Sequence, residues 1–432
     1  MRVSIIGTGY VGSVLGAGLA KLGHDVLLVD IIQAKVDLIN QGKSPIYERG
    51  LQELIAENRE RIKATTNIQE AILGTEITFI CVGTPSRKDG SMSLAQVESA
   101  CSGIASALAR KQQKHYIVIK STVLPGTSEH CIKLISDISG KKFPSDFSLA
   151  FNPEFLREGS AVHDFFNQDR IVIGTTDREI AEKVKELYKE IKAPILETKF
   201  GEAEMIKYTN NSFLATKISF INEIGNICKK LGIDSNVVAR GIGMDFRIGP
   251  HFLKSGLGFG GSCFPKDVSA VVHKATEKGY NPRLLRAVLD VNREQPLKFM
   301  EILEKRAGNL QGKKIAVLGL TFKAGTDDVR ESPSFQVLKE LLLEQAEIYA
   351  YDPVALESVK KIFPYIHYSS SAQEAVASAD ITLILTEWPE FLKVDYGEKL
   401  VIDGKNLFDS ENAARRPKNY EGICWCKETE EL

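Results

Sequence analysis

The glycine-rich segment GLGFGGSCFPKD, residues 256–267, holds the side chain that is best suited to covalent chemistry. Its glycines let the backbone approach a ligand closely, and Pro265 suits the first residue of a following helix. Cys263 then lies just before a helix N-terminus with Lys266 close by, and both features favour the nucleophilic thiolate. A small buried cysteine is the ordinary alternative. The glycine-rich segment before Cys263 favours the nucleophile there.

For the other cysteines we accept the buried alternative. They are Cys81, Cys101, Cys131, Cys228, Cys424 and Cys426. An odd number of scattered cysteines without a CxxC pair argues against a disulfide framework or a structural metal site. We therefore expect no metal and a reducing, cytoplasmic location.

A second pattern, Gly7-x-Gly9-x-x-Gly12, follows an apolar run and precedes a helical one. Such glycines permit a tight turn, close approach of the backbone to a pyrophosphate, and packing of helix on strand. Asp30 ends the next apolar run, where a carboxylate accepts ribose hydroxyls and repels a 2′-phosphate. The pattern predicts NAD rather than NADP, in preference to a glycine-rich turn without a ligand.

Other polar residues carry weaker signals. Lys207 and Asn211 lie one helical turn apart and would present an ammonium and an amide to one ligand. The competing interpretation is a solvated lysine. Glu154 and Glu158 follow a predicted strand, where open-sheet active sites collect loops. Their spacing does not decide between acid–base chemistry and a surface loop.

The segment GLTFK, residues 319–323, has one glycine where the N-terminal pattern has three. We expect no second dinucleotide bound in the same way. Lys323 and Arg330 instead offer cations for a phosphorylated ligand, although a solvated basic loop is equally compatible with their charge.

These residues need elements to position them. Apolar runs alternate with helical stretches from residue 2 to about 190 and again from Lys313, which is typical of parallel sheets covered on both faces. Residues 202–305 show helical periodicity and no strand. Segment 69–85 aligns without gaps to 373–389, with seven identities in seventeen positions, which indicates two related halves.

We therefore predict an α/β fold with two Rossmann-like, doubly wound parallel-sheet domains joined by an all-α connector. The predicted domains are an NAD-binding domain at 1–200, a helical central domain with the cysteine loop at 201–308, and a second sheet domain at 309–432, to which the resemblance described below assigns the UDP-sugar. Ligands of such sheets bind outside the carboxyl ends of the strands.

The composition excludes several classes of protein. There are 55 basic and 56 acidic residues among 432, a net charge of −1, which gives no electrostatic reason to expect nucleic-acid binding. No apolar run is long enough to span a bilayer, and the N-terminal residues do not resemble a secretory signal.

The chain resembles the nucleotide-sugar 6-dehydrogenases of the UDP-glucose/GDP-mannose dehydrogenase family. The matching segments occur in the family's order over almost the whole chain, and GFGGSCFPKD is the most specific. They are GTGYVG (7–12), CVGTP (81–85), KSTV (120–123), NPEFLREG (152–159), KYTNN (207–211), RIGPHFLKSGLGFGGSCFPKD (247–267) and GLTFKAGTDDVRES (319–332).

The resemblance implies a four-electron oxidation of UDP-glucose at C6, which gives UDP-glucuronate and reduces two NAD⁺. Cys263 would trap the aldehyde as a thiohemiacetal, and a second oxidation would give a thioester that water cleaves. Residues implied to assist catalysis are Lys207, Asp267, Asn211 and Thr122, with Glu154 in thioester hydrolysis.

The resemblance also implies binding residues. Those for NAD are Gly7, Gly9, Tyr10, Val11, Gly12, Asp30, Lys35, Thr84, Thr122, Glu158, Lys266 and Arg330. Those for UDP-glucose are Phe155, Leu156, Arg157, Glu158, Lys207, Asn211, Phe252, Leu253, Lys254, Ser255, Gly256, Gly260 and Lys323. Arg247 would reach the substrate of a neighbouring subunit in a homodimer built on the central helices.

One departure is Lys405, where many family members have arginine; lysine keeps the charge and loses the bidentate fork. Three alternatives stay open: another sugar nucleotide (GDP-mannose or a UDP-N-acetyl-hexosamine), a single-step β-hydroxyacid dehydrogenase, and a nucleotide-sugar binding protein without catalysis. The second α/β half counts against the β-hydroxyacid enzymes. The presence of Cys263, Lys207 and Asp267 together counts against a binding protein.

Overall fold

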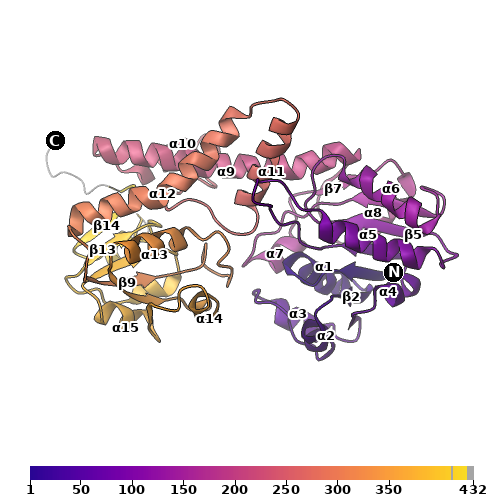
Figure 1. The fold of residues 1–432 in the computed structure, drawn as a ribbon, viewed down its shortest axis with the longest axis horizontal. Coiled ribbons are helices and arrows are strands. Elements are labelled where there is room, and N and C mark those ends of the chain that lie inside the picture. Colours follow the sequence, from indigo (N-terminus) through magenta and orange to yellow (C-terminus); the bar gives the residue numbers. More distant parts are fainter. Residues whose placement is uncertain (410–411, 426–432) are drawn as a thin grey trace. The chain divides into compact units, whose positions relative to one another are not determined.

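The computed structural model describes residues 1–409 and 412–425 and consists of two compact units, Met1–Asn210 and Asn211–Leu432 (Figure 1). The division falls inside the long helix α9 (Phe200–Leu231). Among the described residues no helix combines the length and apolar character needed to cross a membrane.

The first unit is an eight-stranded sheet in the order β3-β2-β1-β4-β5-β6-β7-β8. Its strands are β1 (Arg2–Ile6), β2 (Asp25–Val29), β3 (Ile62–Thr65), β4 (Ile77–Ile80), β5 (His115–Ile119), β6 (Phe147–Phe151), β7 (Ile171–Gly174) and β8 (Ile195–Thr198). Strands β4, β5 and β6 are buried along their whole length, as expected for the centre of a sheet with helices on both faces.

Two groups of helices accompany this sheet. Its helices are α1 (Tyr10–Lys21), α2 (Gln33–Asn40), α3 (Leu51–Glu57), α4 (Ile68–Gly74), α5 (Ala95–Leu108), α6 (Thr127–Ser139), α7 (Ala161–Phe166) and α8 (Arg178–Leu187). Buried residues of α1, α3, α7 and α8 share one core with alternate residues of the strands, such as Val3 and Ile5 of β1. Helix α5 packs on α4 and α6.

The second unit begins with the rest of α9 and three further helices without a strand, followed by a six-stranded sheet. These helices are α10 (Ser235–Gly243), α11 (Phe264–Glu277) and α12 (Arg283–Ala307). The sheet is parallel throughout, in the order β11-β10-β9-β12-β13-β14. Its strands are β9 (Lys314–Leu318), β10 (Glu347–Tyr351), β11 (His367–Tyr368), β12 (Ile381–Ile384), β13 (Leu400–Asp403) and β14 (Tyr420–Gly422), with helices α13 (Pro333–Leu343), α14 (Leu356–Lys360) and α15 (Ala372–Ala377) and 3-10 helices η1 (Pro389–Lys393) and η2 (Ala413–Arg415).

The predicted fold class is confirmed, with one departure in strand direction. Strands β6 and β7 pair antiparallel through Phe151 and Gly174, whereas β7 and β8 are parallel to each other. The last two strands therefore run against the first six. The three-domain division at 200 and 308 stays a prediction, since the compact units meet inside α9.

A buried chain of hydrogen bonds links the starts of β1, β4 and β5. Lys111 Nζ donates to His115 Nδ1 (2.9 Å), so Nε2 carries the ring proton and donates to Thr78 Oγ1 (2.7 Å). The hydroxyl of Thr75 donates to the carbonyl of Ala71, so it must accept from Ser4. The hydroxyl groups therefore donate in one direction, from Thr78 to Ser4 and from Ser4 to Thr75. His115 is thus held neutral inside the sheet.

Replacing His115 with glutamine is expected to reduce the acid sensitivity of the fold. Burial, and next the charge of Lys111, lower the pKa of His115 to about 3. Between pH 6.5 and 3 the unfolded chain binds a proton that the folded chain does not, so stability falls as pH falls, by at most about 5 kcal/mol. The loss in melting temperature from pH 7 to pH 5 should be smaller in the variant than in the wild type. An equal loss in both proteins would contradict this account.

Candidate active site

The glycine-rich turn between β1 and α1 has the geometry of a dinucleotide cradle. Gly7 has φ +97°, and a Cβ there would lie 2.6 Å from the carbonyl oxygen of Cys81. A Cβ on Gly12 would lie 1.8 Å from the Gly7 carbonyl oxygen, so this glycine permits the close helix–strand packing. A Cβ on Gly9 would meet no atom within 4 Å. The N-terminus of α1 is therefore open to a ligand at Gly9.

Asp30 lies at the carboxyl end of β2, beside this turn. It accepts hydrogen bonds from the Thr8 hydroxyl and from the backbone N–H groups of Thr8 (2.9 Å) and Ile32 (3.0 Å). Burial favours the neutral acid, but these bonds and Lys35, 3.9 Å away, outweigh it and lower the pKa of Asp30. An ionised carboxylate here suits the ribose hydroxyls of NAD.

Alanine at Gly9 and at Gly12 should have different effects. Gly12→Ala is expected to destabilise the first unit by about 1–3 kcal/mol or more, because its methyl group overlaps backbone. Gly9→Ala should melt like the wild type but bind NAD⁺ about tenfold more weakly, because its methyl group takes the space of a pyrophosphate contact. Thermal unfolding and calorimetric titration with NAD⁺ separate the two. Unchanged NAD⁺ affinity in Gly9→Ala would place the pyrophosphate elsewhere.

The loop after β6 brings two predicted catalytic residues together. Glu154 and Lys207 are both buried, and Lys207 Nζ donates to Glu154 Oε1 at 2.9 Å. The other carboxylate oxygen, Oε2, accepts from the backbone N–H of Leu156 at 2.6 Å. Burial favours the neutral acid, but the charge and hydrogen bond of Lys207 outweigh it and lower the pKa of Glu154. The loop therefore presents an ionised carboxylate, and Lys207 is not a solvated lysine.

The neighbouring residues of this loop are ordered by contacts within the first unit. The guanidinium of Arg170 lies 3.8 Å from the ring centroid of Phe155, and Lys207 Nζ lies 5.4 Å from the same centroid. Arg157 forms a two-pronged ion pair with Asp164. The guanidinium of Arg157, which the resemblance assigns to substrate binding, is therefore paired with Asp164 in this structure.

The remaining predicted residues of the first unit lie near the carboxyl ends of β1, β4, β5 and β6. Thr84 is buried, and the half-buried ones are Val11, Thr122, Leu156 and Glu158. The Tyr10 hydroxyl donates to the carbonyl of Tyr47 at 2.8 Å. Within this unit the structure thus gathers the predicted NAD residues and the Glu154–Lys207 pair at one edge of the sheet.

In the second unit, Cys263 is the N-cap residue of α11, and Pro265 lies in the first turn of that helix. The helix begins at Phe264, one residue earlier than the proline suggested. Cys263 is half-buried, with Sγ 3.6 Å from Ser262 Oγ. The other described cysteines are buried, as expected, and Cys426 lies outside the described residues.

Asp267 connects Cys263 to helix α9. Its carboxylate is buried and accepts from Asn211 Nδ2 at 2.6 Å and from the Lys266 ammonium. Its backbone N–H donates to the Cys263 carbonyl at 2.9 Å. Asn211 and Asp267, predicted from different motifs, therefore meet beneath the turn that carries Cys263.

The glycine-rich segment before Cys263 is held by amide side chains that the sequence did not reveal. Asn222 Oδ1 accepts from Gly256 N (2.8 Å), and Gln295 Nε2 donates to Gly256 O (2.8 Å). Asn292 makes a pair of hydrogen bonds with the backbone of Phe259. A Cβ on Gly260 would lie 2.3 Å from the Glu331 carbonyl oxygen, so the segment lies directly against that loop.

Several predicted binding residues lie in loops of the second unit. Lys254 pairs with Asp409 at 2.9 Å, and Arg330 forms a fork with Asp328. Phe252 and Lys323 are half-buried, and Leu253 and Ser255 are buried. Lys405 donates to the Phe322 carbonyl at 3.1 Å and lies 3.5 Å from Glu387, so it faces the Lys323 loop.

Arg247 is exposed and forms a fork with Asp245.

In the described part of the chain, no group of three or more His, Cys, Asp or Glu side chains is arranged to hold a metal ion.

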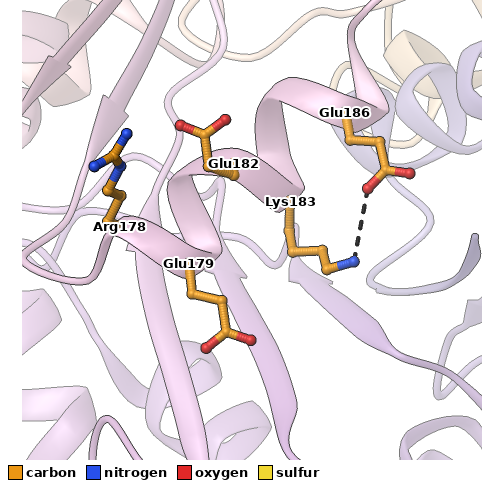
Figure 2. A pocket seen from close by; sticks show the side chains of 5 residues that line it. All are labelled: Arg178, Glu179, Glu182, Lys183 and Glu186. Carbon is orange, nitrogen blue, oxygen red and sulfur yellow. Dashed lines mark ion pairs between the residues drawn. The ribbon is translucent and has the colours of Figure 1, made fainter.

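A concave surface region on α8 contains none of the predicted site residues. Figure 2 shows its lining, Arg178, Glu179, Glu182, Lys183 and Glu186, with Lys183 paired to Glu186 at 3.6 Å. Exposed charge pairs of this kind contribute little to the stability of the fold. We assign no function to the region.

Comparison with known proteins agrees over nearly the whole chain. The NAD binding domain of the UDP-glucose/GDP-mannose dehydrogenase family matches residues 1–192, its central domain matches 201–294, and its UDP binding domain matches 316–410. The UDP-glucose 6-dehydrogenase of Haloferax volcanii is 45% identical, over 98% of this chain and 100% of that protein. The GDP-mannose 6-dehydrogenase of Azotobacter vinelandii is 40% identical over 98% and 100%. The solved UDP-glucose dehydrogenase of Pyrobaculum islandicum superposes with a TM-score of 0.93 at 41% identity, over 98% of each chain.

Proposed function

The chain belongs to the UDP-glucose/GDP-mannose dehydrogenase family, whose N-terminal domain binds NAD, and we propose that it oxidises C6 of UDP-glucose twice to give UDP-glucuronate. The observation that carries this proposal is Cys263 at the N-cap of α11, one helical turn before the buried Asp267 that pairs with Asn211. A single-step alcohol dehydrogenase needs no thiol at its reacting carbon. A four-electron oxidation has a use for one, because capture keeps the aldehyde bound between the two oxidations.

The proposed reaction steps at C6 conserve atoms and electrons. The first oxidation removes a hydride from C6 and the proton of its hydroxyl group, which gives the aldehyde. The thiol then adds across the C6 aldehyde, with the C–S bond formed and its proton passed to the new hydroxyl group. Loss of a hydride and the hydroxyl proton then converts this thiohemiacetal into a thioester. Water replaces sulfur at C6, which releases the carboxylate, the thiol and a proton. When bound, NAD⁺ accepts the hydride lost at each oxidation.

The two buried polar pairs have complementary roles in this scheme. Asp267 and Asn211 fix the first turn of α11 and so the direction of the Cys263 side chain. Lys207 supplies a positive charge for the oxygen anions that develop at C6. Glu154, ionised beside it, accepts the proton of the attacking water in thioester hydrolysis.

In this proposal residues 1–200 hold NAD, residues 309–432 hold the UDP group, and residues 201–308 carry the cysteine. The cradle at Gly7, Gly9 and Gly12 and the ionised Asp30 fit NAD. The corresponding acid of the second sheet, Asp352, is buried and already accepts from Leu320 N, Val354 N, Ala355 N and Trp388 Nε1. That acid is saturated by protein donors, which supports a different nucleotide mode there.

The central helices support a homodimer. Phe213, Phe220 and Ile227 repeat at intervals of two helical turns on α9 and are exposed, as is Leu231. Met244 and Phe246, next to Arg247, are also exposed. An apolar surface of this kind is suited to a second copy of the chain. A reducing cytoplasm suits an enzyme that depends on a reduced thiol.

Two observations favour UDP-glucose over GDP-mannose as the substrate. They are the GFGGSCFPKD segment and the relative that is 45% identical, a UDP-glucose 6-dehydrogenase. Identity alone separates the two weakly, since UDP-glucose and GDP-mannose enzymes both occur at 40%. Lys405 beside Glu387 is the position at which sugar preference could differ from that of arginine-bearing relatives.

The test is to incubate the pure protein with NAD⁺ and each sugar nucleotide in turn and to count NADH per sugar consumed. Two NADH per UDP-glucose is expected, with slower turnover of GDP-mannose and UDP-N-acetyl-hexosamines. One NADH per sugar would overturn the thioester scheme. Tight binding of UDP-glucose without NADH would favour a binding protein.

A further inference from the structure

Lys120, directly after β5, is a buried lysine to which the mechanism above gives no part. Its ammonium lies 2.9 Å from Asn152 Oδ1, 3.3 Å from the Asn152 carbonyl oxygen and 3.4 Å from the Pro153 carbonyl oxygen. A fourth oxygen, the Tyr188 hydroxyl, lies at 3.3 Å. One ammonium therefore holds both backbone carbonyls that immediately precede Glu154.

The backbone of residues 152 and 153 makes few other hydrogen bonds. Pro153 has no N–H, and the N–H of Asn152 donates to the Ile119 carbonyl of β5 (2.9 Å). The Asn152 side chain is engaged at both its nitrogen and its oxygen, because Nδ2 donates to the Val172 carbonyl (2.8 Å) and Oδ1 accepts from Lys120 and from Tyr188. The carbonyls of residues 152 and 153 depend on the ammonium of Lys120.

The charge of Lys120 also acts on the catalytic pair. The titratable groups that face it are Cys81 at the end of β4, Glu154, Lys207 on α9 and Tyr188. Burial raises the pKa of Cys81 to about 12, so that thiol stays neutral and Glu154 is the anion nearby. Burial is also the main reason that the pKa of Lys120 is lowered to about 8, so its charge is present below that pH and lost above it.

We propose that Lys120 is a positioning residue for thioester hydrolysis: its ammonium fixes the Asn152–Pro153 backbone, and so holds the Glu154 carboxylate in its hydrogen bond to Lys207. This inference rests on the role proposed for Glu154. It concerns a residue that touches neither C6 nor the cofactor in the scheme above.

The experiment compares Lys120→Met and Lys120→Arg with the wild type. Lys120→Met is expected to lower kcat about 100-fold, the effect of a misplacement of roughly 1 Å, with KM for UDP-glucose and NAD⁺ changed far less. The acid limb of its kcat profile should move to higher pH, because Glu154 loses a positive neighbour that lowers its pKa. Lys120→Arg should restore most of kcat and return the acid limb to its wild-type position. A loss of stability alone would not move that limb.

A double variant tests whether Lys120 acts through Glu154. Lys120→Met should add little to the loss caused by Glu154→Gln, whereas a loss equal to the product of both would overturn the proposal. If Lys120→Met does not fold, Lys120→Gln, which removes the charge and keeps a donor, takes its place with the same readouts. Wild-type kcat and an unmoved acid limb in the uncharged variant would also overturn the proposal.

The wild-type NADH count comes first and separates the two hypotheses. A ratio other than two is a failure of the proposed function. A ratio of two, combined with either overturning result above, is a failure of the role of Lys120 alone.

Discussion

Cys263→Ala is expected to lose at least about three orders of magnitude in turnover of UDP-glucose to UDP-glucuronate, the scale on which enzymes lose activity when a nucleophile is removed. The neighbouring Ser262 cannot replace the thiol, because a hydroxyl group would give a hemiacetal and not a thiohemiacetal, and it is a weak nucleophile while protonated near neutral pH. In a single turnover the variant should form at most one NADH per active site, against two in the wild type. Rapid mixing with absorbance detection measures both.

Two controls make this result specific to the thiol. Calorimetry should find that Cys263→Ala binds UDP-glucose and NAD⁺ as the wild type does, because the glycine-rich segment is held by Asn222, Asn292 and Gln295. Cys228→Ala, which removes a buried thiol from α9, should keep wild-type turnover. Normal turnover by Cys263→Ala or Cys263→Ser would revive a single-step dehydrogenase of the β-hydroxyacid type.

The alternation of apolar runs and helical stretches indicated the parallel sheets because the central strands β4, β5 and β6 are apolar runs with no exposed face. The edge strands lacked that signal. β8 is exposed over most of its length, and β11 has two residues. The antiparallel pairing of β7 with β6 had no signal either, because strand direction leaves no trace in an apolar run.

The candidate site shows the same division between residues with a sequence signal and residues without one. Glycines and Cys263 stand out because their types are unusual at those positions. Gln295 does not, because a polar residue on a helix normally faces water, yet here it is wholly buried against the Gly256 carbonyl. Lys120 is similar, since its importance follows from the two carbonyls it meets across the sheet.

The ion pairs of two arginines were also beyond sequence reasoning. The resemblance assigns Arg157 and Arg330 to ligands, and both form forks with acids nearby in the chain, Asp164 on helix α7 and Asp328 in the loop of Arg330. A guanidinium has five donors, so such a fork leaves further N–H groups for a phosphate or hydroxyl. The acids orient the arginines. Asp164 lies outside the matching segment that contains Arg157, and although Asp328 and Arg330 share one segment, its letters do not show that the two side chains pair.

Glu154→Gln is expected to separate oxidation from hydrolysis. In the proposed scheme the first oxidation needs the cofactor and the second needs the cofactor and Cys263, whereas neither needs Glu154, so two NADH per active site should appear in a rapid burst. Loss of the general base should then slow steady-state turnover about 100-fold or more, with the thioester accumulating on Cys263. Stopped-flow absorbance measures the burst, and mass spectrometry of the quenched enzyme detects the added mass on the peptide that contains Cys263. Glu182→Gln, an exposed change on α8, is the matched control and should behave as the wild type.

The pH dependence of turnover should report the protonation state of Glu154. Lys207 lowers the pKa of Glu154 despite burial, so the carboxylate is ionised in mildly acidic solution and wild-type hydrolysis should persist below the ordinary range of a glutamate. Protonation at still lower pH removes the base, and turnover should fall there. Glutamine cannot titrate, so Glu154→Gln should lack that fall while staying slow throughout. If the burst is one NADH, or absent, Glu154 takes part before the thioester forms, and the ion pair with Lys207 serves the oxidation steps instead.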